Sequence, residues 1–331
     1  MMLNSTKMLF MMFMFMSTLI SVSSNNWLTG WMGLEINLMA FIPILYSKMN
    51  YYSSESSMKY FIIQSSSSMI LLLGIILSSL KININMSSVI MTCGLLTKLG
   101  VAPFHMWVPS IMEGINWMNC LILSTWQKIA PLTLISYSVN NSMLITPAML
   151  SMLIGSVGGL NQSSIKKLMA YSSINNIGWI LISMMMSMLA WVNYFMIYSL
   201  MIFMFMCMLN KENMNYINQC FMSTFKSMNK VLFLIMLLSM GGMPPMLGFM
   251  PKWMIIQLTV MFNMYIVVTM MVVSSLIVLF YYIQMSFSML MINSQKLKWM
   301  ELLITKNKMM IISFFINMFG FIFIIIIKSM V

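Results

Sequence analysis

The sequence contains no arginine and no aspartate. Apart from one histidine, its charged residues are therefore 17 lysines and five glutamates. Charged residues make up only 7% of the 331 residues, whereas 61% are hydrophobic. A soluble protein of this length needs many more charged side chains on its surface. The scarcity of charge therefore excludes an ordinary soluble domain and predicts an all-α polytopic membrane protein.

Ligands for redox centres and nucleotides are also scarce. The four cysteines form no CxxC pair, His105 is the single histidine, and neither a GxGxxG after a strand pattern nor a Walker sequence occurs. We therefore expect this chain to bind no flavin, iron–sulfur cluster, nucleotide or zinc. The net charge of +12 would suggest nucleic acid in a soluble protein. These lysines are dispersed in short loops, so we do not expect nucleic acid as a partner.

Methionine, by contrast, is abundant, with 51 residues spread evenly along the chain. Methionine is flexible and apolar, so it can replace leucine on a lipid-facing helix. Together with the missing arginine and aspartate, this bias indicates the mutational pressure of an AT-rich organellar genome. The even spread argues against a methionine-rich copper site.

Apolar segments long enough to cross a bilayer recur along the whole chain. We predict about eleven transmembrane helices, since about 20 residues span the hydrocarbon layer. The segments lie near residues 1–22, 25–47, 58–80, 86–113, 116–137, 144–161, 165–188, 190–209, 229–262, 264–291 and 309–328. The first segment, with Lys7, also resembles a signal peptide, but the apolar segments that follow favour a first span.

The lysines expected outside the bilayer, in loops or at the ends of these segments, fall mainly on one side of the membrane. The side that holds the N-terminus would receive twelve: Lys7, Lys48, Lys59, Lys166, Lys167, Lys211, Lys226, Lys230, Lys296, Lys298, Lys306 and Lys308. The other side would receive Lys81 and Lys328. By the positive-inside rule, the N-terminus is predicted on the matrix or cytoplasmic side and the C-terminus on the opposite side.

Glycine and proline interrupt two of the predicted spans, at Pro103 and at Pro244 and Pro245. Proline removes an amide donor and clashes with the carbonyl four residues earlier, so both spans are predicted to be broken helices. Ordinary proline kinks are the alternative. The interruptions occupy the fourth and ninth spans, which is the same place in two successive sets of five.

Because five is odd, the second set of spans would be inverted relative to the first. The sequence therefore predicts a single membrane domain, 1–331, with inverted five-helix repeats at 1–137 and 144–291 and a C-terminal helix at 309–328. Paired breaks in inverted repeats indicate the ion path of a transporter.

Four charged residues lie deep inside predicted spans: Glu35, Lys98, Lys128 and Lys252. Each opposes insertion by about 2.5–3.5 kcal/mol, so such residues normally face a bundle interior and handle ions or protons. One structural bridge between Glu35 and Lys128 is the alternative, but it would leave two lysines without an acid. Burial weakens the hold of a lysine on its proton and a nearby carboxylate strengthens it. A moving Glu35 could therefore switch a lysine between holding and releasing a proton.

Further candidates for a proton relay are His105, Lys167, Tyr171 and Asn176. Histidine titrates near neutral pH, although a lone histidine is more often a packing residue. Lys167 lies at the start of a span, where an interfacial lysine that extends to the headgroups is the alternative.

The motifs that contain these residues resemble one family, subunit 2 of mitochondrial NADH–ubiquinone oxidoreductase, respiratory complex I, in an arthropod, insect-like version. They cover residues 33–37, 98–107, 126–131, 167–173 and 241–253. The resemblance extends over nearly the whole chain. It implies an antiporter-like fold in the mitochondrial inner membrane, shortened at the N-terminus relative to bacterial relatives, and a role in proton pumping.

The resemblance also implies roles for individual residues and partners. Glu35 matches the family's transmembrane glutamate, Lys98 and Lys128 match lysines of the first broken helix and the helix after it, and Lys252 matches that of the second broken helix. Asn176 stands where many relatives have histidine, and asparagine cannot titrate. NAD, FMN, iron–sulfur clusters and ubiquinone would be used elsewhere in the complex. The implied partners are other complex I subunits, including neighbouring antiporter-like subunits, lipids such as cardiolipin, and protons.

Two other functions remain open from the sequence. A self-contained cation/proton antiporter would need a cation site, and no intramembrane aspartate exists to supply one. A structural membrane subunit would assist assembly without moving protons.

Overall fold

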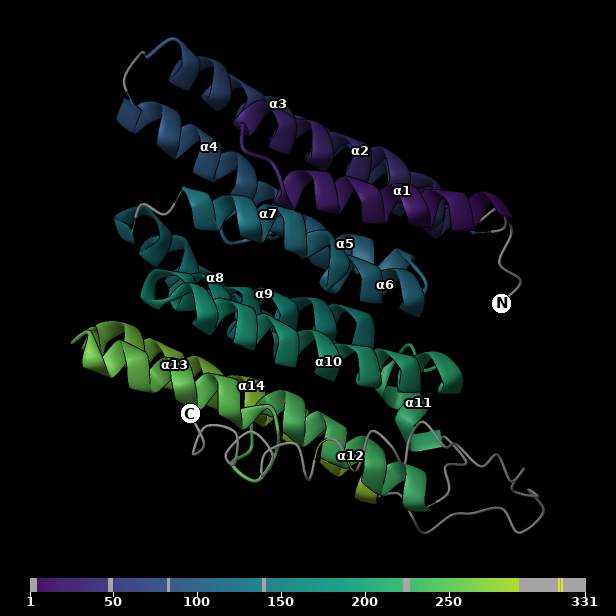
Figure 1. Cartoon of the computed structure of the whole chain (residues 1–331). Helices are drawn as coiled ribbons and strands as arrows, with labels where there is room; N and C mark the ends of the chain where they lie inside the picture. The colour runs from purple at the N-terminus through teal and green to yellow at the C-terminus, as the bar shows by residue number, and fades with distance from the viewer. Residues whose placement is uncertain are drawn as a thin grey trace. The chain divides into compact units, whose positions relative to one another are not determined.

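The computed structural model describes residues 5–46, 50–81, 84–138, 141–222, 227–291, 315 and 317, and these residues are almost entirely helical (Figure 1). Over the described ranges no named strand occurs, and one isolated bridge joins Ser164 and Tyr216. Among the residues that the structure describes, five helices are long and apolar enough to cross a membrane. The predicted all-α membrane fold is therefore confirmed. Apart from residues 315 and 317, the predicted C-terminal helix at 309–328 lies outside the described residues.

The described residues fold as two compact units, 1–151 and 152–331. The helices of the first unit are α1 Ser5–Val22, α2 Trp27–Leu45, α3 Tyr51–Ser79, α4 Ile84–Leu99, α5 Trp107–Gly114, α6 Trp117–Ser124 and α7 Trp126–Tyr137. Within this unit α2 packs on α1 and α3, and α3 packs on α4 and α5. Helix α7 contacts α1, α2 and α4, and Lys128 and Pro131 in its first half line one cavity together with Lys98 and Leu99 at the end of α4.

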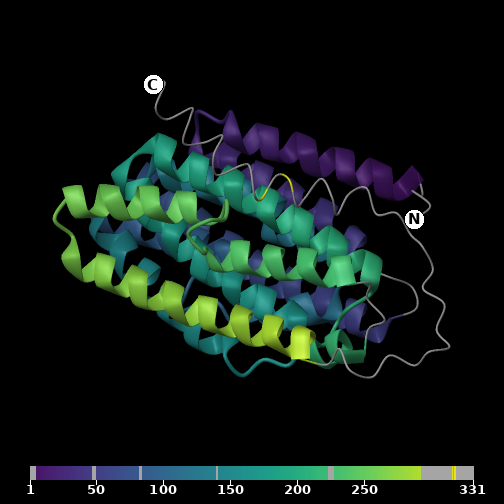
Figure 2. The ribbon, with the colours of Figure 1, turned by 90° about the horizontal axis from the view of Figure 1, so that it is seen from below.

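The boundary between the units falls inside α8 Asn141–Gly159. The other helices of the second unit are α9 Ile165–Met186, α10 Met188–Glu212, α11 Ile217–Met222, α12 Ser227–Gly241, α13 Phe249–Met261 and α14 Tyr265–Met291. Most side chains of α9 are buried, so this helix is the centre of the unit. Figure 2 shows α12 and α13 end to end with α14 alongside, and α14 contacts both.

Serine is common in these apolar helices, and its hydroxyl is satisfied locally. In α3, for example, Ser56, Ser67 and Ser68 each donate to the carbonyl three residues earlier, at 2.7–2.9 Å. A hydroxyl that is bonded within its own helix needs no water, so it can lie in a membrane.

Both broken spans end at glycine rather than at proline. Gly100 and Gly242 have positive φ of 71° and 85°. The amides of Val101 and Met243 each bond to the carbonyl five residues back, Leu96 and Leu238, both at 3.1 Å. Two helices therefore end in the same glycine-based Schellman cap. The prolines follow inside the breaks, where they prevent the helix from continuing.

The predicted spans up to residue 291 coincide with helices, with three differences. Helix α3 begins at Tyr51, seven residues before the predicted span. The short helix α11 was not predicted. The predicted span at 116–137 consists of two helices, α6 and α7, which are separated at Thr125. Pro131 lies inside α7 and cannot donate to the Gln127 carbonyl.

Candidate functional site

Lys98 lies in the last turn of α4, directly before the first break, and its exposed fraction is 6%. The backbone around it is held from two neighbouring helices. Gln64 on α3 donates to the Lys98 carbonyl at 3.3 Å, and the Trp107 indole on α5 donates to the Thr97 carbonyl at 3.1 Å. The Gln64 bond gives a partner to a carbonyl at the end of α4, where helical carbonyls lack an amide donor within the helix. The Thr97 carbonyl also accepts the Gly100 amide of the cap at 3.1 Å.

Glu35 and Lys128 come to the same region from α2 and α7. Glu35 is partly buried and attracts Lys98 electrostatically. Lys128 is 4% exposed and lies three residues after the break between α6 and α7. Three of the four predicted proton-translocating residues, Glu35, Lys98 and Lys128, belong to the first unit, and the structure brings them to one region of it.

A cavity of about 20 Å³ lies between the two lysines. Its polar lining comes from Lys98, Lys128, Asn37, Tyr60, Gln64 and Gln127. A volume of about 10–15 Å³ is enough for one water molecule, which also needs polar partners. The cavity therefore has the size and the polar lining to hold a water molecule next to the two lysines.

An amide pair forms one wall of this cavity. Asn37 Nδ2 donates to Gln127 Oε1 at 2.9 Å, and Gln127 Nε2 donates to Asn37 Oδ1 at 3.2 Å. The Tyr60 hydroxyl donates to the same Gln127 oxygen at 3.4 Å. These contacts join α2, α3 and α7 next to Lys128. These contacts were not predicted from the sequence, although amide side chains within apolar spans indicate where helices hydrogen-bond to one another.

Lys252 lies in the first turn of α13 in the second unit, with 5% of its surface exposed. Its Nζ donates to the Gly241 carbonyl at 2.9 Å and lies 5.9 Å from the centre of the Trp179 ring. A Cβ on Gly242 would lie 3.0 Å from this Nζ. Glycine is therefore required at 242 by its positive φ and by the space that Lys252 occupies.

The two broken helices give their lysines a related electrostatic setting. Lys98 belongs to the last turn of α4, and Lys252 bonds to the last residue of α12. The C-terminus of a helix carries a partial negative charge, which stabilises a cation there. The C-terminal ends of α4 and α12 therefore each help to stabilise a buried lysine inside an apolar unit.

The remaining predicted residues lie in different places. His105 is buried, and its Nδ1 lies 3.2 Å from the Pro103 carbonyl within the break. Lys167 and Tyr171 are partly buried on α9, with the Tyr171 ring against Gly158. Asn176 accepts a hydrogen bond from Tyr194 on α10 at 2.9 Å. Their part in a relay stays a prediction. Within the described ranges, no three His, Cys, Asp or Glu side chains gather as metal ligands would.

Comparison with known proteins is consistent with this arrangement. Residues 24–278 match the family described as NADH:quinone oxidoreductase/Mrp antiporter, TM. The NADH-ubiquinone oxidoreductase chain 2 of Anopheles gambiae is 46% identical over 317 residues, covering 93% of each chain. That of Locusta migratoria is 39% identical over 315 residues, covering 93% of this chain and 92% of the relative.

A solved structure shows the same fold. A chain of respiratory complex I from Thermus thermophilus superposes with a TM-score of 0.78 at 20% identity, covering 86% of this chain and 71% of that one. The insect relatives and the family match confirm the resemblance of the sequence motifs. The chain therefore belongs to the family of NADH-ubiquinone oxidoreductase chain 2, within the wider NADH:quinone oxidoreductase/Mrp antiporter family.

Proposed function

We propose that Glu35, Lys98 and Lys128 in the first unit and Lys252 in the second unit carry protons through this chain. The observation on which the proposal depends is the cluster of the first unit. There, two buried lysines line one cavity, and Glu35 attracts one of them. A purely structural subunit would not need two buried cations around a polar cavity, because each buried charge costs folding free energy.

The chain is a multi-pass protein of the inner mitochondrial membrane and a membrane-arm subunit of the proton-translocating NADH:ubiquinone oxidoreductase. Its partners are other subunits of that complex. Oxidation of NADH and reduction of ubiquinone would take place on other subunits, and this chain would bind no cofactor of its own.

The charge pattern of the cavity supports a switch. Two ammonium groups around one small cavity repel each other, so a proton on one lysine weakens proton binding on the other. Two unit charges about 7 Å apart interact by about 2.4 kcal/mol at an effective dielectric constant near 20. Glu35 close to Lys98 would favour the proton on Lys98, and its withdrawal would favour transfer through water to Lys128.

The lysine distribution indicates the orientation of the chain. The N-terminus would face the matrix and the C-terminus the intermembrane space, because twelve lysines expected outside the bilayer fall on the N-terminal side. Protons would move from that side to the other. The same lysines would attract anionic lipids such as cardiolipin.

Glu35→Gln tests this proposal. Glutamine keeps the shape of the side chain and removes its charge. Lys98 then loses the electrostatic attraction that would favour its protonated form. We expect proton pumping by the assembled complex in liposomes to fall at least about tenfold, because a positioned acid–base group typically contributes about 10²–10⁴-fold to a rate. The measurement is the initial rate of proton uptake or release per NADH oxidised.

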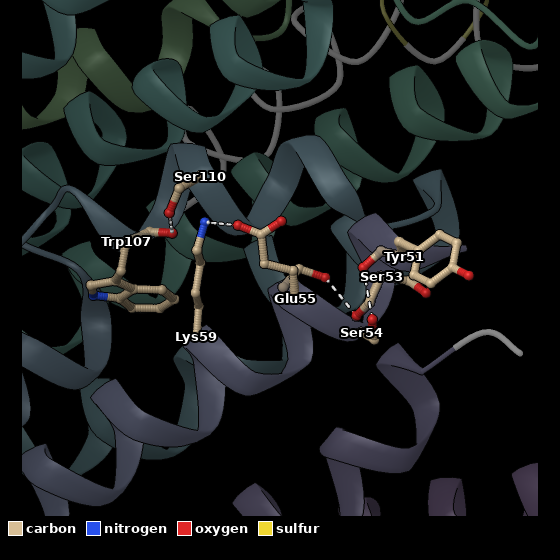
Figure 3. Close-up of polar contacts among 8 residues, drawn as sticks. Tyr51, Ser53, Ser54, Glu55, Lys59, Trp107 and Ser110 are labelled. Atoms are coloured by element: carbon tan, nitrogen blue, oxygen red, sulfur yellow. Dashed lines mark hydrogen bonds and ion pairs between the residues drawn. The ribbon is translucent and has the colours of Figure 1, made fainter. Parts of the chain in front are cut away.

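Glu55→Gln is the matched control. Glu55 pairs with Lys59 at 2.6 Å on the exposed start of α3, and Figure 3 shows this pair near Trp107 and Ser110 of α5. Exposed ion pairs contribute about 0–1 kcal/mol, so pumping should change less than about twofold. Full pumping by Glu35→Gln in an assembled complex would favour a structural subunit. Sodium-driven proton exchange by the isolated chain would favour a self-contained antiporter.

A further inference from the structure

The second unit contains a small cavity at Lys252 that the proposed relay does not explain. It has a volume of about 20 Å³, enough for one water molecule. Its polar lining includes Lys252, Asn176, Tyr194, Tyr198 and Ser239. Lys252 is the one charged member, and Asn176 cannot take up a proton at neutral pH. A proton that leaves Lys252 therefore needs a water molecule as its first acceptor.

Tyr194 is held in one orientation at this cavity. Its exposed fraction is 3%, and its hydroxyl donates to Asn176 Oδ1 at 2.9 Å. Its ring stacks on Trp179, with centroids 6.4 Å apart and planes within 8°. Because the hydroxyl hydrogen points to Asn176, the oxygen lone pairs of Tyr194 remain available to accept a hydrogen bond.

Trp179 connects this tyrosine to the lysine. One indole stacks on Tyr194 and also lies 5.9 Å from Lys252 Nζ. A cation over an indole face is attracted by the ring. Trp179 thus fixes the ammonium group and the phenol ring around the same cavity.

We infer that Tyr194 is a positioning residue that orients the water molecule which accepts a proton from Lys252. An N–H bond of the ammonium group breaks and an O–H bond forms on the water, so Lys252 becomes a neutral amine and the positive charge moves to the water. Tyr194 accepts a hydrogen bond from that water, which stabilises the new charge. The inference rests on the proposed function, because it assumes that Lys252 releases protons.

Tyr194→Phe tests the inference in the assembled complex. Phenylalanine keeps the ring stack on Trp179 and removes the hydroxyl that orients the water. We expect the pumping rate to fall about tenfold, as for loss of one hydrogen bond to a charged group. The solvent deuterium isotope effect on pumping should increase, while the KM for ubiquinone and the amount of assembled complex stay unchanged. A residue that only packs would alter neither the rate nor the isotope effect.

Tyr265→Phe is the matched control, since Tyr265 is exposed and also donates to an asparagine, Asn263 Oδ1, at 3.1 Å. It should leave pumping and its isotope effect unchanged. Should Tyr194→Phe fail to assemble, Asn176→Leu provides the same test, because it removes the acceptor that orients the Tyr194 hydroxyl. Wild-type rates and isotope effects in either assembled variant would overturn the inference.

Lys252→Met separates this inference from the proposed function. Loss of pumping in Lys252→Met with full pumping in Tyr194→Phe would refute the role of Tyr194 alone. Full pumping in Lys252→Met would refute the role of Lys252 in the proposed relay, and the role of Tyr194 with it.

Discussion

Lys98→Met should abolish proton pumping while leaving the complex assembled. Methionine has a similar length and no charge, so Glu35 loses its electrostatic partner and the cavity loses one of its two lysines. Loss of a positioned acid–base group typically lowers a rate by about 10²–10⁴-fold, and we expect about 100-fold here. Removal of a buried charge also removes a cost of about 2.5–3.5 kcal/mol, so membrane insertion should not suffer.

The control for this variant is Lys59→Met, which replaces an exposed lysine in the same unit. Lys59 pairs with Glu55 at the exposed start of α3, and its own side chain does not line the cavity. Its replacement should leave pumping within about twofold of the wild type, because exposed ion pairs contribute little. Equal losses in both variants would mean that any lost lysine impairs the complex, which contradicts a specific role for Lys98.

Gly248→Ala should prevent assembly of the complex or lower its thermal stability strongly. The added Cβ would overlap the Ser239 carbonyl oxygen and lie 2.9 Å from the carbonyl carbon. Both are backbone atoms of α12, so they cannot move aside as a flexible side chain could. Overpacking a core typically costs about 1–3 kcal/mol, and a clash with backbone should reach at least the upper end. The measurement is the amount of assembled complex and its thermal denaturation midpoint.

Gly241→Ala is the matched control at the same broken helix. A Cβ there would be no closer than 3.6 Å to Leu279 and Tyr282, which is ordinary van der Waals contact. Its carbonyl would still accept the bond from Lys252. Normal assembly in both variants would show that α12 and α13 do not approach as closely as described.

The sequence predicted the helical elements and the two breaks well, because these depend on local chemistry. Apolar length marks a span, and a glycine followed by proline marks a place where a helix must end. Gly100 with Pro103 and Gly242 with Pro244 are such pairs. The sequence prediction nevertheless attributed the ends of both helices to the prolines that follow. The caps show that glycine ends both helices through its positive φ.

The sequence could not predict which polar side chains meet across helices. Asn37 and Gln127 are 90 residues apart and bond only because α2 and α7 pack with their amides at the same height. Tyr194 reaches Asn176 because of the register between α10 and α9. Register depends on side-chain packing along the whole helix, and hydrophobic periodicity contains little of that information. The separation of α6 and α7 at Thr125 was not predicted, because neither glycine nor proline marks it in the sequence.

The most direct test of the relay is an experimental density map of the assembled complex in which bound water is visible. The account predicts an ordered water between the Lys98 and Lys128 ammonium groups, about 3 Å from at least one Nζ, with the Gln127–Asn37 pair alongside. A dry cavity filled by apolar side chains, with both ammonium groups turned towards the membrane surface, would contradict it.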